Sequence, residues 1–368
     1  MLAAHFAAVS VTLLLVGRLL PPPAISDHEM MEYVGQGVIN PGCTNLNCWR
    51  ILAAAIVERF PGPSLPRWRT YAALGNAAGA AITAQLAITL GLPRHAALLA
   101  MWISALSVGS FTTVYHPYTS DSMIFFLAPL IMLLWVRQRL GAAGTVAAIG
   151  IFAKEFAAAP LFIGAGAAGL LGEWPRFRRS LLIGLAVTAF WTAYQISLMV
   201  FFDYAYDANP SINLFAGGYF WYWLQHVSPL TAIATVFASF GAAYLLAAAG
   251  LIRAPDLLRA LAAGAVLPAL AFMYVETPDR ALFNLFFVVA PLAALALIST
   301  PLIARWVFVA SYGLANLRMA SSWEVLPPAR FALGVSLAVA LVAVVRMRRQ
   351  NPAPSMVTKA GWQKANGR

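Results

Sequence analysis

Charged side chains are scarce in this sequence of 368 residues: Asp, Glu, Lys and Arg together make up 10% of it. Soluble globular proteins carry about 25% charged residues, so the composition excludes an ordinary soluble domain. Hydrophobic residues make up 61%, and the mean hydropathy is +0.76. Apolar runs long enough to span a bilayer recur along the whole chain, which is typical of an all-α polytopic membrane protein.

Acidic residues are scarcer than basic ones: 13 Asp and Glu stand against 24 Lys and Arg, which gives a net charge of +11. Such an excess can indicate nucleic-acid binding. Here the basic residues cluster between apolar runs, and the excess of Lys and Arg on cytoplasmic membrane faces explains them more simply. We therefore expect no nucleic-acid partner.

Cysteine is nearly absent: Cys43 and Cys48, in the segment CTNLNC, are the only two. Without a nearby pair of histidines they are poor zinc ligands. On an extracytoplasmic, oxidising face the pair is suited to a disulfide that closes this short segment.

The first apolar stretch, residues 2–20, lacks both the basic start and the clear cleavage site of a secretory signal, so we expect a retained first helix. Residues 1–346 are predicted to form a single transmembrane domain without internal repeats. Residues 347–368 are predicted to form a basic, disordered cytoplasmic tail.

Residues 21–69 form a long polar segment, which we interpret as the first extracytoplasmic loop. Within it, residues 49–60 have the apolar spacing of an amphipathic helix that lies at the membrane interface. Its Arg50 and Arg59 are suited to bind lipid phosphates. A plain surface helix is the alternative.

The remaining apolar runs follow one another with short polar connections. They lie near residues 70–91, 95–115, 121–136, 141–172, 180–202, 228–252, 257–275, 281–304, 305–320 and 329–345.

The run at 141–172 conflicts with the charges on either side of it. The basic segments 137–139 (RQR) and 176–179 (RFRR) both favour the cytoplasm, yet a single crossing would place them on opposite sides. One helix over this run would be about 48 Å long, against about 30 Å for the bilayer core. Two short helices that fold back at Lys154 and Glu155 remove both conflicts.

With this fold-back the chain makes about ten to twelve crossings, and both termini are cytoplasmic. Charged and histidine side chains then gather on the extracytoplasmic face, where we expect a binding cleft. These side chains are Asp27, His28, Glu29, His116, Asp121, Lys154, Glu155 and Arg280. Some have an ordinary alternative: Asp121 could cap a helix, and Lys154 with Glu155 could form a structural ion pair.

Four features recur together along residues 1–300: DHE (27–29) after the first helix, an interfacial helix in a long outer loop, HPYTSDS (116–122) before the fourth helix, and the fold-back AKE (153–155). This set resembles the GT-C superfamily of integral-membrane glycosyltransferases, which use polyprenyl-phosphate sugars. YVETPDRALFN (274–284) is similar to a late outer loop of its bacterial members. The chain departs from the pattern because it shows no soluble C-terminal domain, which many members carry, and because His28 separates two acids that are adjacent in some members.

The resemblance implies transfer of a sugar from a polyprenyl-phosphate donor to a lipid, glycan or protein acceptor at the outer face of the inner (plasma) membrane. It makes Asp27, with Glu29 second, the acid that deprotonates the acceptor, and it gives Asp121 the second acidic position. Asp27 and Asp121 would also hold a divalent cation, Mg²⁺ or Mn²⁺, where the reaction uses one. The side chains suited to the donor and its lipid phosphate are His28, Arg50, His116, Lys154, Glu155 and Arg280.

Two other functions are compatible with the same pattern. A secondary transporter also has charges and broken helices within the membrane, although its charges lie near the midplane and its fold contains repeats. A catalytically silent scaffold with the same fold is the other alternative, because one fold hosts many functions.

Overall fold

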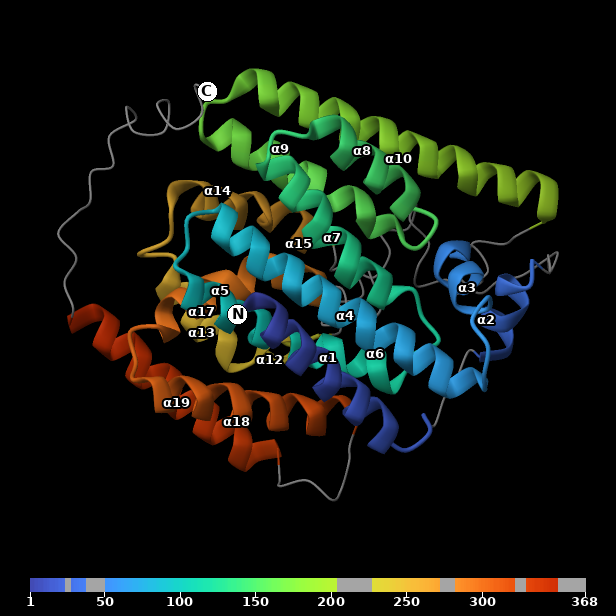
Figure 1. The fold of residues 1–368 in the computed structure, drawn as a ribbon. Coiled ribbons are helices and arrows are strands. Elements are labelled where there is room, and N and C mark those ends of the chain that lie inside the picture. The colour runs from blue at the N-terminus through green and yellow to red at the C-terminus, as the bar shows by residue number, and fades with distance from the viewer. Residues whose placement is uncertain (24–27, 38–49, 204–226, 272–281, 322–328, 350–368) are drawn as a thin grey trace.

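The computed structural model describes residues 1–23, 28–37, 50–203, 227–271, 282–321 and 329–349. Within these ranges every regular element is a helix, and most of the helices lie side by side in one bundle (Figure 1). Four of the described helices are long and apolar enough to cross a membrane, or up to six when each bent pair counts as one span. The chain is therefore an integral membrane protein with an all-α polytopic fold, as its composition predicts.

The first half of the bundle is built around one long helix, α4 (Ser64–Thr89). Its neighbours are α1 (Leu2–Leu19), α5 (Arg94–Ala105) and α7 (Asp121–Val136). The backbones of α4 and α7 approach so closely that a Cβ on Gly79 would lie 2.1 Å from the carbonyl oxygen of Phe125. Small residues at such contacts are typical of helices that pack within membranes.

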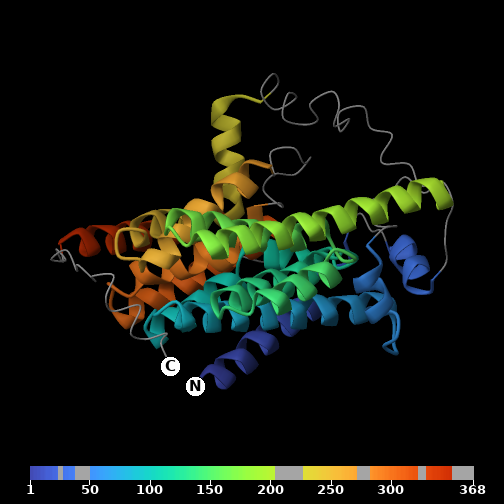
Figure 2. The ribbon, with the colours of Figure 1, turned by 90° about the horizontal axis from the view of Figure 1, so that it is seen from above.

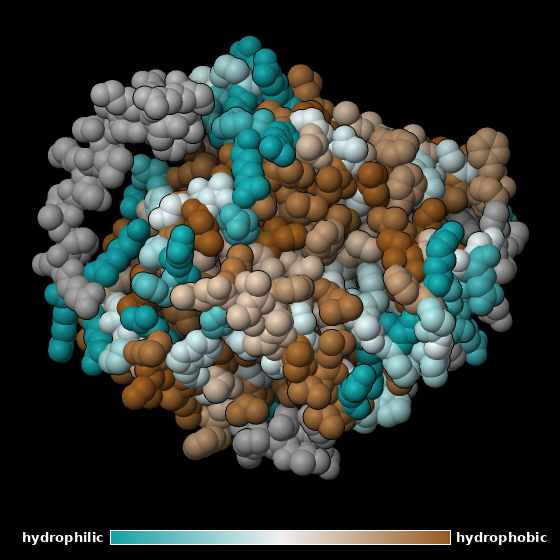
Figure 3. Space-filling model, in the orientation of Figure 1, coloured by the Kyte–Doolittle hydropathy of each residue, from teal (hydrophilic) through white to brown (hydrophobic). Residues whose placement is uncertain are grey.

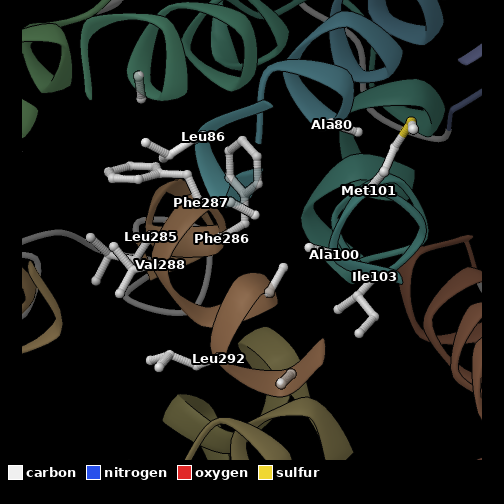
Figure 4. Packing of buried hydrophobic residues seen from close by; sticks show 14 of the residues in the cluster. Ala80, Leu86, Ala100, Met101, Ile103, Leu285, Phe286, Phe287, Val288 and Leu292 are labelled. Atoms are coloured by element: carbon white, nitrogen blue, oxygen red, sulfur yellow. The ribbon is translucent and has the colours of Figure 1, made fainter. Parts of the chain in front are cut away.

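The second half is built around α17 (Phe286–Leu297), which is buried along almost its whole length. It packs against α5 and against α13 (Ala242–Gly250). Figure 4 shows its Phe286 and Phe287 in the same apolar cluster as Leu86 of α4 and Ile103 of α5. The surrounding helices are α14 (Asp256–Gly264), α15 (Val266–Ala271), α18 (Leu302–Ser321) and α19 (Ala329–Arg349).

The predicted span at 95–115 is broken into α5 and α6 (Val108–Tyr115), which meet at an angle of 41°. Ser107 caps α6 by accepting a hydrogen bond from the backbone N–H of Ser110. The Leu106 carbonyl at the break accepts a 2.8 Å hydrogen bond from the buried Asn316 amide of α18. A break inside an apolar bundle persists because its freed backbone groups find such partners.

The predicted span at 228–252 is also bent, and more sharply. α12 (Pro229–Phe240) and α13 meet at 82°, and Gly241 between them has a φ of 49°. Glycine adopts this left-handed backbone readily because it has no Cβ. α12 therefore projects away from the other helices (Figure 2).

The run at 141–172 folds back on itself, as predicted. It consists of α8 (Leu140–Gly150), the 3₁₀ helix η2 (Glu155–Ala158) and α9 (Ala159–Leu170). Both α8 and α9 pack on α10 (Trp174–Phe202). Phe152, after α8, contacts Phe190 of α10, whereas Gly169 at the end of α9 faces Phe177, back toward the start of α10. The turn of this hairpin contains Lys154 and Glu155.

The fold-back places both basic segments at one end of the bundle. Arg176 at the start of α10 donates a 2.7 Å hydrogen bond to the carbonyl oxygen of Trp135, near the end of α7, and its guanidinium lies 3.5 Å above the Trp135 ring. We call this the basic end, and the opposite end, with Asp121 and Lys154, the site end. In Figure 3, hydrophobic side chains predominate across the middle of the face shown, and hydrophilic ones gather toward its top, left and right edges.

Candidate functional site

Asp121 begins α7 at the site end of the bundle. The cap position of that helix belongs to Ser120, so Asp121 lies one residue inside the helix rather than at the cap named as its alternative role. The Asp121 carboxylate lies in the first helical turn, where the helix dipole favours negative charge. It accepts a hydrogen bond from the Lys154 ammonium of the fold-back turn.

Lys154 and Glu155 each bind a residue of another element. Lys154 is paired with Asp121, and Glu155 is paired with Arg50, whose Nη2 lies 3.2 Å from Oε1 and 3.3 Å from Oε2. The predicted pairing of Lys154 with Glu155 is thus replaced by two pairings across elements. Two cations and two acids form one continuous row, which we call the charge row: Arg50, Glu155, Lys154 and Asp121.

Arg50 is held at this place by the short helix that follows it. The predicted interfacial helix 49–60 is α3 (Ile51–Val57), so it is present but shorter. The backbone N–H of Leu52 donates a 3.0 Å hydrogen bond to the carbonyl oxygen of Phe152, which ties the start of α3 to the fold-back turn. The helix α3 and the fold-back turn therefore form one unit around the charge row.

The other predicted site residues are only partly placed. Glu29 is exposed in the first turn of α2 (His28–Gly35), and the His116 ring contacts Tyr115 with centroids 4.4 Å apart. Asp27, Arg280, Cys43 and Cys48, together with the side chain of His28, lie outside the described residues. Their roles and the disulfide stay predictions.

A buried carboxylate that the sequence analysis missed joins α3 to α4. Glu58 accepts a 2.6 Å hydrogen bond from Arg67 and a 3.0 Å hydrogen bond from the Trp68 indole. Nothing in the local pattern reveals this contact, because residues 59–63 turn the chain back between the partners. We call the three residues the Glu58 clasp.

A small apolar cluster surrounds the clasp and fastens α2 and α3 to the bundle. Its members come from α2, α3, α4 and the loop before α7: Met31, Ala54, Val57, Trp68 and Tyr118. Burial raises the pKa of the Tyr118 phenol, against a lowering by the Ser64 hydroxyl, so the phenol is neutral at pH 7. The cluster fixes the position of α3 and therefore that of Arg50.

A cavity of about 640 Å³ lies between α3, α4 and the start of α7, and none of the four charge-row residues is part of its wall. Its walls are mostly apolar and include Ile56, Phe60, Leu74 and Phe126. Ser122, the residue after Asp121, also lines it. The cavity volume lies in the usual range for small-molecule sites, about 300–1,000 Å³.

The divalent cation that the resemblance implies stays a prediction, because Asp27, one of its two proposed ligands, lies outside the described residues. Among the residues that the structure describes, no group of three or more His, Cys, Asp or Glu side chains could hold a metal ion. The Lys154 ammonium, moreover, binds the Asp121 carboxylate. In this part of the site the positive charge that could face a phosphate comes from Lys154 and Arg50.

Comparison with solved structures identifies the fold. ArnT from Cupriavidus metallidurans in the apo state matches with a TM-score of 0.50 at 11% identity, over 94% of this chain and 76% of that one. The same protein bound to undecaprenyl phosphate matches at 0.48 and 13%, over 94% and 75%. An oligosaccharyltransferase from Archaeoglobus fulgidus matches at 0.48 and 13%, over 98% of this chain and 59% of its own.

The chain has the fold of the GT-C glycosyltransferases, as the motif set predicts. No protein-family model and no curated protein matches the sequence. At such low identity the likeness shows the fold alone, and any activity has to be argued from the site.

Proposed function

We propose that this protein transfers a sugar from a polyprenyl-phosphate donor to an acceptor hydroxyl at the extracytoplasmic face of the inner membrane. The observation that carries the proposal is the charge row, in which Arg50, Glu155, Lys154 and Asp121 meet at one end of a GT-C fold. The ArnT protein that shares this fold also occurs with undecaprenyl phosphate bound.

The charge row supplies what the leaving phosphate requires. When the bond between the anomeric carbon and the phosphate oxygen breaks, the electron pair stays on that oxygen and its negative charge grows. Fixed cations that face a developing charge stabilise the transition state. Lys154 and Arg50 are both held by acids in the described structure, so they are already in place when the phosphate arrives.

The acceptor proton needs a carboxylate. Asp121 can take it once the Lys154 ammonium turns from the carboxylate to the donor phosphate, since the ammonium then no longer competes with the acceptor hydroxyl. The resemblance proposes Asp27 for the same step. The acceptor oxygen then forms the new bond to the anomeric carbon.

A transfer assay with purified protein, a labelled polyprenyl-phosphate sugar and membrane extract tests the proposal. We expect the variant that removes the proton-accepting acid, either Asp27→Asn or Asp121→Asn, to lower the transfer rate about 10²–10³-fold. Asp256→Asn, which removes an exposed partner of Arg259, is the control and should leave the rate unchanged. No transfer by the unaltered protein with any extract, together with ion-driven uptake into proteoliposomes, would point to a transporter.

A further inference from the structure

The cavity between α3, α4 and α7 has the walls of a lipid-chain site. Ile56, Phe60, Leu74 and Phe126 line it, and the first three are large apolar side chains that remain exposed. An exposed apolar surface in a membrane protein meets hydrocarbon, so a chain can enter the cavity from the bilayer without crossing water.

One end of the cavity carries polar groups that lack a partner. The hydroxyls of Tyr71 and Ser122 are buried: the Ser122 hydroxyl makes no hydrogen bond within the part of the chain that the structure describes, and the Tyr71 hydroxyl meets only the backbone of Met123. Ser122 follows Asp121 directly, and the Tyr71 phenol lies within electrostatic range of the Asp121 carboxylate. A buried hydroxyl without a partner is costly, so the Ser122 hydroxyl, with the underused Tyr71 phenol in the same cavity wall, indicates that a ligand supplies the missing hydrogen bonds.

The charges around the cavity favour an uncharged ligand group at that end. Arg67 is the cation in its wall. Its Nη2 binds the Glu58 carboxylate at 2.6 Å, which balances its charge, and its Nη1 binds the Phe60 carbonyl oxygen at 3.1 Å, whereas its buried Nε has no partner in the described structure. A phosphate is better placed at the charge row, where Lys154 and Arg50 lie. The two hydroxyls match an alcohol, which both donates and accepts hydrogen bonds.

We propose that this cavity binds the hydrocarbon chain of a lipid acceptor, with an uncharged hydroxyl of its head group held by Tyr71 and Ser122 next to Asp121. This inference rests on the proposed function and names its acceptor class. The acceptor O–H proton passes to the Asp121 carboxylate, and the acceptor oxygen bonds to the anomeric carbon. The bond from that carbon to the phosphate oxygen breaks, and the electron pair stays on the phosphate.

Photolabelling of the full chain in lipid nanodiscs tests the binding claim without an activity assay. The probe is a diacylglycerol with a diazirine in one acyl chain, and the labelled peptides are mapped by mass spectrometry. We expect label in residues 56–74 and 122–126. Leu74→Trp fills the cavity and should lower that label about tenfold, which corresponds to about 1.4 kcal/mol of lost binding. Leu182→Trp, at an exposed site on α10, is the matched control.

Tyr71→Phe separates a ligand contact from a structural role. Because the Tyr71 hydroxyl has no side-chain partner in the described structure and meets only the Met123 backbone, its removal should change the unfolding temperature of the ligand-free protein little. It should raise the KM for a diacylglycerol acceptor about tenfold and leave the KM for the donor unchanged. A loss of thermal stability with unchanged KM would assign the hydroxyl to the fold and overturn the proposal.

A polyprenyl-phosphate probe with the same diazirine distinguishes the two lipid sources. Label from this probe at 56–74 that diacylglycerol does not displace would make the cavity a donor site and overturn the proposal. Diacylglycerol label that Leu74→Trp does not change would also overturn it. Specific diacylglycerol label with sugar transfer to a glycan or protein but to no lipid would end the acceptor assignment and leave the proposed function standing, whereas label without transfer to any acceptor would end both.

Discussion

Lys154 and Asp121 bring opposite charges into a mostly apolar part of the bundle, where 17% and 13% of their side chains remain exposed. Removing water from a charge is costly, and their mutual attraction offsets that cost only while both partners are present. The pair therefore has two separate effects at the residue scale. It neutralises buried charge in the resting protein, and it positions the ammonium and the carboxylate for the proposed reaction.

A double-mutant cycle separates these two effects. We expect Lys154→Met to lower the free energy of unfolding by about 3 kcal/mol, because the Asp121 carboxylate stays buried without its partner. Adding Asp121→Asn removes that charge and should restore most of the stability, measured by thermal unfolding in detergent. Transfer should remain about 10²–10³-fold reduced in the double variant. Recovery of transfer together with stability would show that the pair is structural only.

At the scale of elements, the Glu58 clasp fixes the position of α3 and therefore the place where Arg50 pairs with Glu155. Glu58→Gln removes the charge that holds Arg67, and hydrogen bonds to charged groups contribute about 1.5–3 kcal/mol. We expect the amides of α3 to exchange with deuterium roughly tenfold faster, because the equilibrium constant for local opening of this helix rises by about the same factor. The exposed pair of Arg259 with Asp256 serves for comparison: Asp256→Asn should leave α3 exchange unchanged.

The close contact of α4 with α7 is a second element-scale feature, and Gly79 makes it possible. Gly79→Val should lower the free energy of unfolding by about 1–3 kcal/mol, because the new side chain forces the Phe125 backbone away. Gly334→Val in α19 is the matched control, since a Cβ at Gly334 meets nothing within 4 Å. Equal unfolding temperatures for the two variants would contradict this account of the contact.

Local sequence features predict the fold-back but not the partners of its charged turn. The run at 141–172 is too long for one span, and the basic segments that favour one side of the membrane lie directly beside it in the sequence. The hairpin can therefore be predicted from residues that are close together in the chain. Lys154 pairs with a residue 33 positions earlier, and Glu155 with one 105 positions earlier. Such pairs depend on how helices pack in space. The 82° bend at Gly241 could not be predicted from the sequence either, because a lone glycine in an apolar run also occurs in straight helices.

For the whole molecule, the two ends of the bundle carry different kinds of charge. At the site end, the two cations and two acids of the charge row balance one another. At the basic end, Arg176 of the segment 176–179 contacts Trp135, just before the segment 137–139. Basic residues in short loops favour the cytoplasmic side, so we propose that the basic end faces the cytoplasm and the site end faces outward.

Cysteine labelling in intact cells tests this orientation. The background is the double variant Cys43→Ser and Cys48→Ser, which has no cysteine. Two single-cysteine proteins are made from it by replacing one exposed residue in each: Gln36→Cys at the end of α2, or Arg179→Cys at the basic end. A membrane-impermeant maleimide should label Gln36→Cys in intact cells and Arg179→Cys only after permeabilisation, because the bilayer separates the two ends. Label at Arg179→Cys from outside would invert the topology and place the charge row in the cytoplasm. The proposed extracytoplasmic transfer would then be wrong, whatever the chemistry of the site.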